Sequence, residues 1–183
     1  MHGTEQASAW VQRWSHLAPT GAPMLDVACG GGRHLRWFAA LGHPTTGVDR
    51  SPEAVQAAAL VGEGLCADIE NHPWPLAGRQ FGVVVVTHYL WRPLLPAIVA
   101  SVAPGGVLIY ETFAAGNETV GKPARPDFLL QHGELLTACA GLRIVAYEDG
   151  YLDAPERFVQ RIVAVRPQAQ NSAAPRHLLT SPL

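Results

Sequence analysis

The sequence has little of what disulfide-rich and metal-binding proteins need. It contains only 3 cysteines in 183 residues. Cys29, Cys66 and Cys139 are widely spaced and form neither a CxxC pair nor a Cys/His cluster. An odd number of separated thiols is typical of a reduced, intracellular protein rather than of a disulfide framework. No two of the 8 histidines have the i, i+4 spacing of ligands on one helix, so we expect no metal site.

Charge and long apolar runs are also scarce. Asp, Glu, Lys and Arg make up 15% of the chain, against about 25% in an average protein. The net charge of −2 and the pI near 6.4 provide no field that would hold a polyanion, so we expect no nucleic-acid partner. The longest apolar stretches, such as residues 83–86, are far too short to cross a membrane, and the first residues lack a signal-peptide run. We therefore expect a cytoplasmic protein.

What the chain does contain is enough apolar material for a single packed domain. Hydrophobic residues make up 48% of the sequence, with 18 glycines and 15 prolines for tight turns. We assign the domain to residues 1–166, of which residues 1–22 are an N-terminal helix and linker. Residues 167–183 show no periodicity, and we expect them to be a disordered tail.

Apolar periodicity predicts alternating strands and helices. Short buried strands are expected at residues 23–28, 45–49, 65–68, 81–87 and 107–112. Helices are expected at residues 5–17, 33–42, 51–62, 93–102 and 128–140. Residues 142–147 and 158–166 read as an antiparallel pair that completes the sheet. The order predicts an α/β fold with one doubly wound, mostly parallel, seven-stranded sheet and helices on both faces.

A glycine-rich turn follows the first predicted strand at residues 28–32. Glycines there let the backbone approach a ligand, and the next helix offers free N–H groups and its positive dipole end. Asp49 ends the second strand about twenty residues later, where an acid can accept hydrogen bonds from both ribose hydroxyls. Leu35 stands where a dinucleotide fingerprint needs its third glycine, which weakens but does not remove a nicotinamide-cofactor alternative.

Several motifs in register carry a family resemblance. The segments LDVACGGG, VDRSPEA, ADIE, FGVVVVTHYL and VAPGGVLIYET, in this order, resemble the class I S-adenosylmethionine-dependent methyltransferases. The resemblance extends from Met24 to Arg166. Within that superfamily, the segment after the fifth strand resembles small bacterial methyltransferases related to tellurite-resistance and thiopurine-type enzymes.

The resemblance implies S-adenosylmethionine as cofactor and assigns residues to its parts. Asp49 would face the ribose, Asp68 and the Ile69 backbone the adenine edge, and His88 would lie beneath the sulfonium. Asp26 and the glycine-rich turn would face the methionine end. The residues expected to contact the cofactor also include Ala28, Cys29, Gly30, Gly32, Arg33 and Arg50. Ala28 replaces a common glycine, which we expect to be tolerated at a negative φ. The alternative for Asp68 is a loop cap.

The acceptor side carries weaker signals. Methyl transfer from a sulfonium needs in-line placement and a dry pocket more than a covalent catalyst. Candidate catalytic residues at the carboxyl ends of the fourth and fifth strands, and in the loops beside them, are His88, Tyr89, Glu111, Arg92 and Arg125. The two arginines would clamp an anionic small-molecule acceptor, and the loop at residues 114–127 would close over it. Each of these residues has a plainer alternative as a solvated or strand-capping side chain.

The predicted function is therefore methyl transfer from S-adenosylmethionine to a small-molecule acceptor by direct displacement at the sulfonium. Two alternatives stay open: an NAD(P)-binding oxidoreductase and a non-catalytic protein that binds S-adenosylmethionine. The segment after the fourth strand lacks the Asn/Asp-Pro-Pro-Tyr pattern, which argues against DNA adenine or glutamine side chains as acceptors. The sequence leaves the identity of the acceptor and the oligomeric state open.

Overall fold

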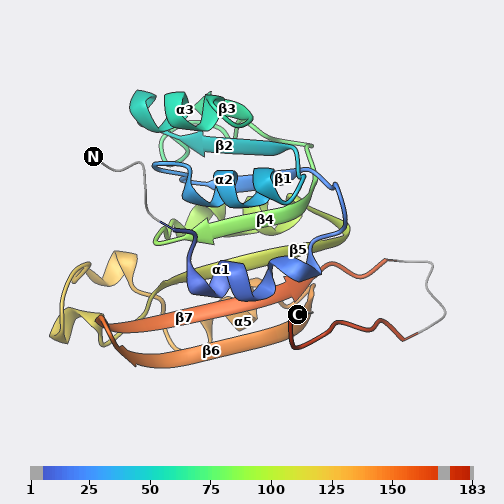
Figure 1. Ribbon diagram of the computed structural model, residues 1–183. Helices are drawn as coiled ribbons and strands as arrows, with labels where there is room; N and C mark the ends of the chain where they lie inside the picture. The colour runs from blue at the N-terminus through green and yellow to red at the C-terminus, as the bar shows by residue number, and fades with distance from the viewer. Residues whose placement is uncertain (1–5, 169–173, 182–183) are drawn as a thin grey trace.

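A computed structural model describes residues 6–168 and 174–181 (Figure 1). One seven-stranded sheet runs through the molecule in the order β3-β2-β1-β4-β5-β7-β6. Strands β1 to β5 are parallel, whereas β7 is antiparallel to both β5 and β6. The strands are β1 (Met24–Val27), β2 (Thr45–Asp49), β3 (Glu63–Cys66), β4 (Phe81–Thr87), β5 (Val102–Phe113), β6 (Arg143–Asp153) and β7 (Glu156–Val165). This confirms the predicted fold class.

Helices cover both faces of this sheet. They are α1 (Ala9–Trp14), α2 (Arg33–Ala40), α3 (Pro52–Ala59), α4 (Leu95–Ala100) and α5 (Glu134–Ala138). Figure 1 shows α1 and α2 in front of the sheet and α5 behind it. Short 3-10 turns lie at Ser15–Leu17, Arg92–Leu94, Asn117–Thr119 and Pro126–Phe128. None of the helices that the structure describes has the length and apolarity needed to cross a membrane.

The core has two layers because strand side chains alternate between the faces. Val83 and Val85 of β4 pack with the α1 and α2 side, whereas Val84 and Val86 pack with the α4 and α5 side. All four valines are fully buried, as expected for a central parallel strand.

The strand order creates a switch point between β1 and β4. The chain leaves β1 toward β2 on one side and returns to β4 on the other. In open α/β sheets, ligands bind at such a point, outside the carboxyl ends of the strands. Residues that follow β1, β2 and β4 are therefore brought to one edge of the sheet.

Several element boundaries differ from the prediction. The expected helix at residues 128–140 shortens to α5, because the Leu130 N–H donates to the Phe113 carbonyl and Leu130 forms a bridge with Ala114. The third strand begins at Glu63, two residues early, and β5 begins at Val102, where it pairs with Phe81. Strands β6 and β7 extend into the expected link and form a long hairpin.

The two ends of the chain were predicted as a helix and a disordered tail. Residues 1–5, 169–173 and 182–183 lie outside the described residues, so these predictions can be compared with only part of each end. The described N-terminal helix is α1, which continues as the 3-10 turn Ser15–Leu17. Residues 167–168 and 174–181 form neither helix nor strand, and the His16 Nε2 lies 2.9 Å from the Leu178 carbonyl oxygen.

Candidate functional site

The glycine turn lies at the carboxyl end of β1 and opens toward unfilled space. Gly30 and Gly32 have φ values of 50° and 72°, in the left-handed region that favours glycine. A Cβ placed on Gly30 would meet nothing within 4 Å. The turn therefore presents bare backbone to a space large enough for a ligand to approach it closely.

Ala28 departs from the expectation. Its φ is 56°, so the negative φ under which we expected alanine to be tolerated is not adopted. A Cβ in this conformation approaches the following carbonyl oxygen, which costs about 1–2 kcal/mol. The chain bends sharply out of β1 at this residue, and local strain of this kind clusters at functional sites.

Replacing Ala28 with glycine is expected to stabilise the protein. Relief of the left-handed strain outweighs the extra freedom of glycine in the unfolded chain, for a net gain of about 0.5–1 kcal/mol. Urea unfolding of Ala28→Gly measures this gain. The control is Ala39→Gly in α2, where the same exchange should lose about 1 kcal/mol. A loss at Ala28 comparable to the loss at Ala39 would show that the turn carries no strain.

Asp49 at the end of β2 holds the turn in place. Its Oδ2 accepts a hydrogen bond from the Gly30 N–H at 2.9 Å, and its Oδ1 accepts one from the Ser51 N–H at 2.9 Å. Each carboxylate oxygen still has capacity for a further hydrogen bond. Asp49 is half-buried and lines a cavity, so it can support the turn and meet a ligand with the same carboxylate.

A second acid, Asp26, lies within β1 beneath the turn. It is 1% exposed, and its Oδ2 has no hydrogen-bond partner among the described residues. His34 Nδ1 lies 3.4 Å from this oxygen, and His34 Nε2 accepts a hydrogen bond from the Ser8 N–H at 3.3 Å. Because Nε2 accepts, we assign the ring proton to Nδ1, on the side of Asp26. Ser8 caps α1, so His34 connects the start of α1 to the acid below the glycine turn.

His34→Ala is expected to destabilise the protein by about 1–3 kcal/mol, because it leaves the buried Asp26 carboxylate and the Ser8 N–H without a neighbour. Hydrogen exchange should also rise at Ala9–Trp14, the helix that Ser8 caps. Chemical denaturation combined with exchange mass spectrometry measures both effects. The control is the exposed His132→Ala, which should change neither. Equal stability of the two variants would contradict the role of His34.

The Cys29 thiol lies in the same turn but is not suited to nucleophilic chemistry. It is buried, and this burial, together with the negative charges of Asp26 and Asp49, raises the pKa of the Cys29 thiol to about 12. The group is therefore a neutral thiol at neutral pH. Its place in the site is structural.

A cavity of about 250 Å³ lies beside the turn. Its lining comes from the ends of β1 and β2, from the segments after β3 and β4 and from the 3-10 turn in the loop after β5: Ala28, Asp49, Arg50, Ala67, Asp68, Ile69, Glu70, Tyr89 and Phe128. Five residues of the predicted cofactor set thus meet at one cavity. Of the other six, Asp26, Cys29, Gly30, Gly32 and Arg33 form the adjacent turn and the elements on either side of it, and His88 lines the neighbouring cavity described below.

Asp68 makes the hydrogen bonds of a loop cap, which was the alternative to a contact with adenine. Its Oδ1 accepts hydrogen bonds from the Glu70 and Asn71 N–H groups, and its Oδ2 accepts one from Asn71 Nδ2 at 2.8 Å. The Asn71 side chain is the main reason why the pKa of Asp68 is lowered. Asp68 is a loop cap that also borders the cavity.

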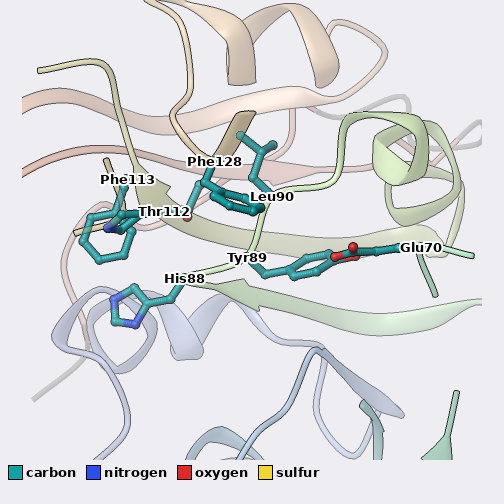
Figure 2. A pocket seen from close by; sticks show the side chains of 8 residues that line it. Glu70, His88, Tyr89, Leu90, Thr112, Phe113 and Phe128 are labelled. Carbon is teal, nitrogen blue, oxygen red and sulfur yellow. The ribbon is translucent and has the colours of Figure 1, made fainter. Parts of the chain in front are cut away.

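A second cavity of about 270 Å³ adjoins the first, and Figure 2 shows it from close by. We call it the aromatic cavity. Its lining is Glu70, His88, Tyr89, Leu90, Thr112, Phe113, Pro123 and Phe128. Glu70, Tyr89 and Phe128 line both cavities. Together the two cavities reach the range of about 300–1,000 Å³ that small-molecule sites usually occupy.

His88 follows β4 and stands at the rim of the aromatic cavity. Its φ is 53°, and its ring stacks on Phe113 with 5.1 Å between centroids. Packing around the ring, and next the positive charge of Arg33, lower the pKa of His88 below its ordinary value, while Glu111 opposes the shift. The imidazole is therefore neutral at neutral pH and able to accept a proton.

Of the other predicted catalytic residues, only Tyr89 lies at a cavity described above. Tyr89 lines both cavities. Glu111 is buried on the α1 face of β5, where its Oε2 lies 3.9 Å from Arg161 Nη1, and it is not part of either lining. Arg92 donates to Glu134 Oε1 at 2.7 Å and to the carbonyl of Leu129 at 2.8 Å.

Arg125 is also engaged outside the cavities. It is largely exposed, pairs with Asp127 at 3.0 Å and lies over the Phe128 ring at 5.2 Å. The structure therefore brings His88 and Tyr89 to the aromatic cavity but not Glu111, Arg92 or Arg125. The expected anion clamp of two arginines is not assembled.

Sequence reasoning missed most of the aromatic cavity. Glu70 lies in the ADIE motif, two residues after Asp68, and could have been found from that proximity. Phe113 ends β5, so its place at the carboxyl edge was also accessible. Phe128 reaches the cavity only through the course of a long loop, for which the sequence carries no signal.

Comparison with known proteins shows which domains this chain resembles. Residues 25–110 match the family described as a methyltransferase domain. A malonyl-[acyl-carrier protein] O-methyltransferase of Serratia marcescens is 30% identical over 140 residues, covering 67% of this chain and 54% of the relative. A ubiquinone biosynthesis O-methyltransferase of Cereibacter sphaeroides is 33% identical over 121 residues, covering 60% and 49%.

Solved structures show the same fold. TehB from Haemophilus influenzae superposes with a TM-score of 0.70 at 18% identity, covering 90% of this chain and 64% of that chain. At this identity the likeness concerns the fold alone. This chain spans about half the length of the curated relatives that it matches.

Proposed function

We propose that this protein is an S-adenosylmethionine-dependent methyltransferase acting on a small molecule, because residues 25–110 match a methyltransferase-domain family and the sheet has the class I fold. The observation that carries the proposal is the hydrogen bond from the Gly30 N–H to Asp49. It joins the open glycine turn after β1 to the acid at the end of β2, beside a cavity at the switch point of the sheet.

The residues present fit this cofactor. S-adenosylmethionine carries positive charges on its sulfonium and amino groups, and the turn and cavity carry the carboxylates of Asp26, Asp49, Asp68 and Glu70. Asp26 has a buried carboxylate oxygen without a hydrogen-bond partner among the described residues, which suits an ammonium group nearby. Asp26 and the turn would hold the methionine end, Asp49 the ribose, and Asp68 with Ile69 the adenine.

When bound, S-adenosylmethionine supplies an electrophilic methyl group. The chain's own part is to position the acceptor, exclude water and move a proton. The rings that line the aromatic cavity exclude water from its walls. Neutral His88 at the rim is placed to take a proton from an acceptor that loses one.

Isothermal titration calorimetry with S-adenosylmethionine, S-adenosylhomocysteine and NADH tests the cofactor. We expect the first two to bind and NADH not to bind. Preferential binding of NADH would instead support the NAD(P)-binding oxidoreductase. Release of S-adenosylhomocysteine in the presence of an acceptor separates an enzyme from a non-catalytic binding protein. Neither alternative is favoured by the family match or by the named relatives.

Turnover is expected to fall as the pH drops through the lowered pKa of His88. The sign follows from the shift: because the pKa lies below the ordinary histidine value, His88 is neutral at neutral pH and loses its base form only in acid. The pH profile of kcat for His88→Gln should lose this acid limb, with a rate reduced about 10²-fold or more. An unchanged acid limb in the variant would assign the limb to another group.

A further inference from the structure

The aromatic cavity has an unusual balance of rings and charge. Four of its eight lining side chains are rings: His88, Tyr89, Phe113 and Phe128 (Figure 2). Glu70 is its one acidic member, and no lysine or arginine lines it in the part of the chain that the structure describes. Flat walls of this kind favour stacking with an aromatic ring, and the carboxylate favours a hydrogen-bond donor over an anion.

Several arginines lie around the aromatic cavity, but none of them is part of its lining. Arg92 donates hydrogen bonds to Glu134 and to backbone carbonyls, and Arg125 pairs with Asp127 at the surface. Arg50 lines the neighbouring cavity together with Asp49 and Asp68. An anionic ligand in the aromatic cavity would therefore face a carboxylate without a cation in the lining.

Tyr89 gives the second, independent observation. Its hydroxyl is buried and lies beside the Glu70 carboxylate. Burial, followed by the negative charge of Glu70, raises the pKa of Tyr89, so the hydroxyl keeps its proton. Figure 2 shows the Tyr89 ring extending toward the Glu70 side chain. A donor and an acceptor thus lie together at one end of a ring-lined cavity.

We propose that the aromatic cavity is the acceptor pocket and that it selects an aromatic molecule whose hydroxyl or amino substituents donate to Glu70 and which carries no negative charge. This inference rests on the proposed function. Tyr89 can donate to the same substituent, while Phe113 and Phe128 bound the ring. Glu70 is then the specificity-determining residue, because it attracts donors and cations and repels carboxylates.

Matched probes test the charge preference. Tyramine and 4-hydroxyphenylacetate share a phenol ring and differ in the charge of the side arm. Calorimetry with protein saturated with S-adenosylhomocysteine should show tyramine binding about tenfold more tightly. Glu70→Gln should reduce the ratio to about threefold or less. The control is Glu63→Gln, at the amino end of β3 and the opposite edge of the sheet, which should keep the native ratio.

The outcomes separate this inference from the proposed function. If S-adenosylhomocysteine itself does not bind, the proposed function fails. If it binds, and 4-hydroxyphenylacetate binds as tightly as tyramine or neither probe binds, the pocket assignment is overturned and the proposed function stands. Competition of tyramine with S-adenosylhomocysteine would assign the aromatic cavity to the cofactor and also overturn the inference. Retention of the preference in Glu70→Gln would remove Glu70 from its role.

Discussion

Gly30→Val is expected to abolish binding of S-adenosylmethionine and S-adenosylhomocysteine. A valine there would place its branched side chain in the open space above the turn, where we place the cofactor. It would also strain a residue whose φ is 50° and disturb the hydrogen bond from its N–H to Asp49. Calorimetry should show no saturable heat for the variant under conditions that saturate the native protein.

Gly21→Val provides the matched control. Gly21 also has a positive φ, at 66°, and a Cβ placed on it would likewise meet nothing within 4 Å. It precedes the amino end of β1, whereas Gly30 follows the carboxyl end, so the two variants carry similar strain at opposite edges of the sheet. Gly21→Val should lose stability but keep its cofactor affinity. Native affinity in a folded Gly30→Val protein would remove the turn from the site.

Asp49→Ala is expected to weaken cofactor binding roughly ten- to hundredfold, the loss associated with hydrogen bonds to a charged group. The carboxylate has two functions that alanine cannot replace. It accepts from the Gly30 and Ser51 N–H groups, and in the proposed complex it also accepts from the ribose. Calorimetric titration with S-adenosylhomocysteine measures the loss, and circular dichroism verifies that the fold persists.

Asp68→Ala is the comparison for this variant. Asp68 borders the same cavity, but both of its carboxylate oxygens accept hydrogen bonds from its own loop. Asp68→Ala should therefore reduce cofactor affinity less than Asp49→Ala. Asp49→Asn keeps one acceptor oxygen and should fall between Asp49→Ala and the native protein. Collapse of the fold in Asp49→Ala, with no separable effect on binding, would make Asp49 a structural cap only.

The arrangement around the glycine turn could be predicted because its signals are local. The glycine turn directly follows a strand, and Asp49 directly ends the next one. Parallel strands bring such ends to one edge of the sheet whatever the rest of the chain does. The mostly parallel sheet and its antiparallel pair followed from the alternation of strands and helices in the sequence. The positive φ at Ala28 could not be foreseen, because the sequence does not report the backbone angle that the turn requires.

The aromatic cavity could not be predicted because it depends on long-range packing. Phe128 reaches the aromatic cavity through a loop whose path is fixed by pairing of Leu130 with Ala114 and Phe113. Arg92 was placed at the correct end of the sheet, but its partner Glu134 lies 42 residues away in sequence. Charge and position alone could not show that its donors are already satisfied within the fold.

Amide hydrogen exchange with and without S-adenosylhomocysteine tests the central claim most directly. The ligand should protect residues 28–32, 49–51 and 68–70, where the turn, Asp49 and the segment after β3 surround one cavity. The far end of the β6–β7 hairpin, residues 151–156, serves as the internal reference and should not change. Protection of all three segments by S-adenosylhomocysteine and not by NADH is the predicted result. Protection that spares these segments, or that NADH reproduces and S-adenosylhomocysteine does not, would contradict it.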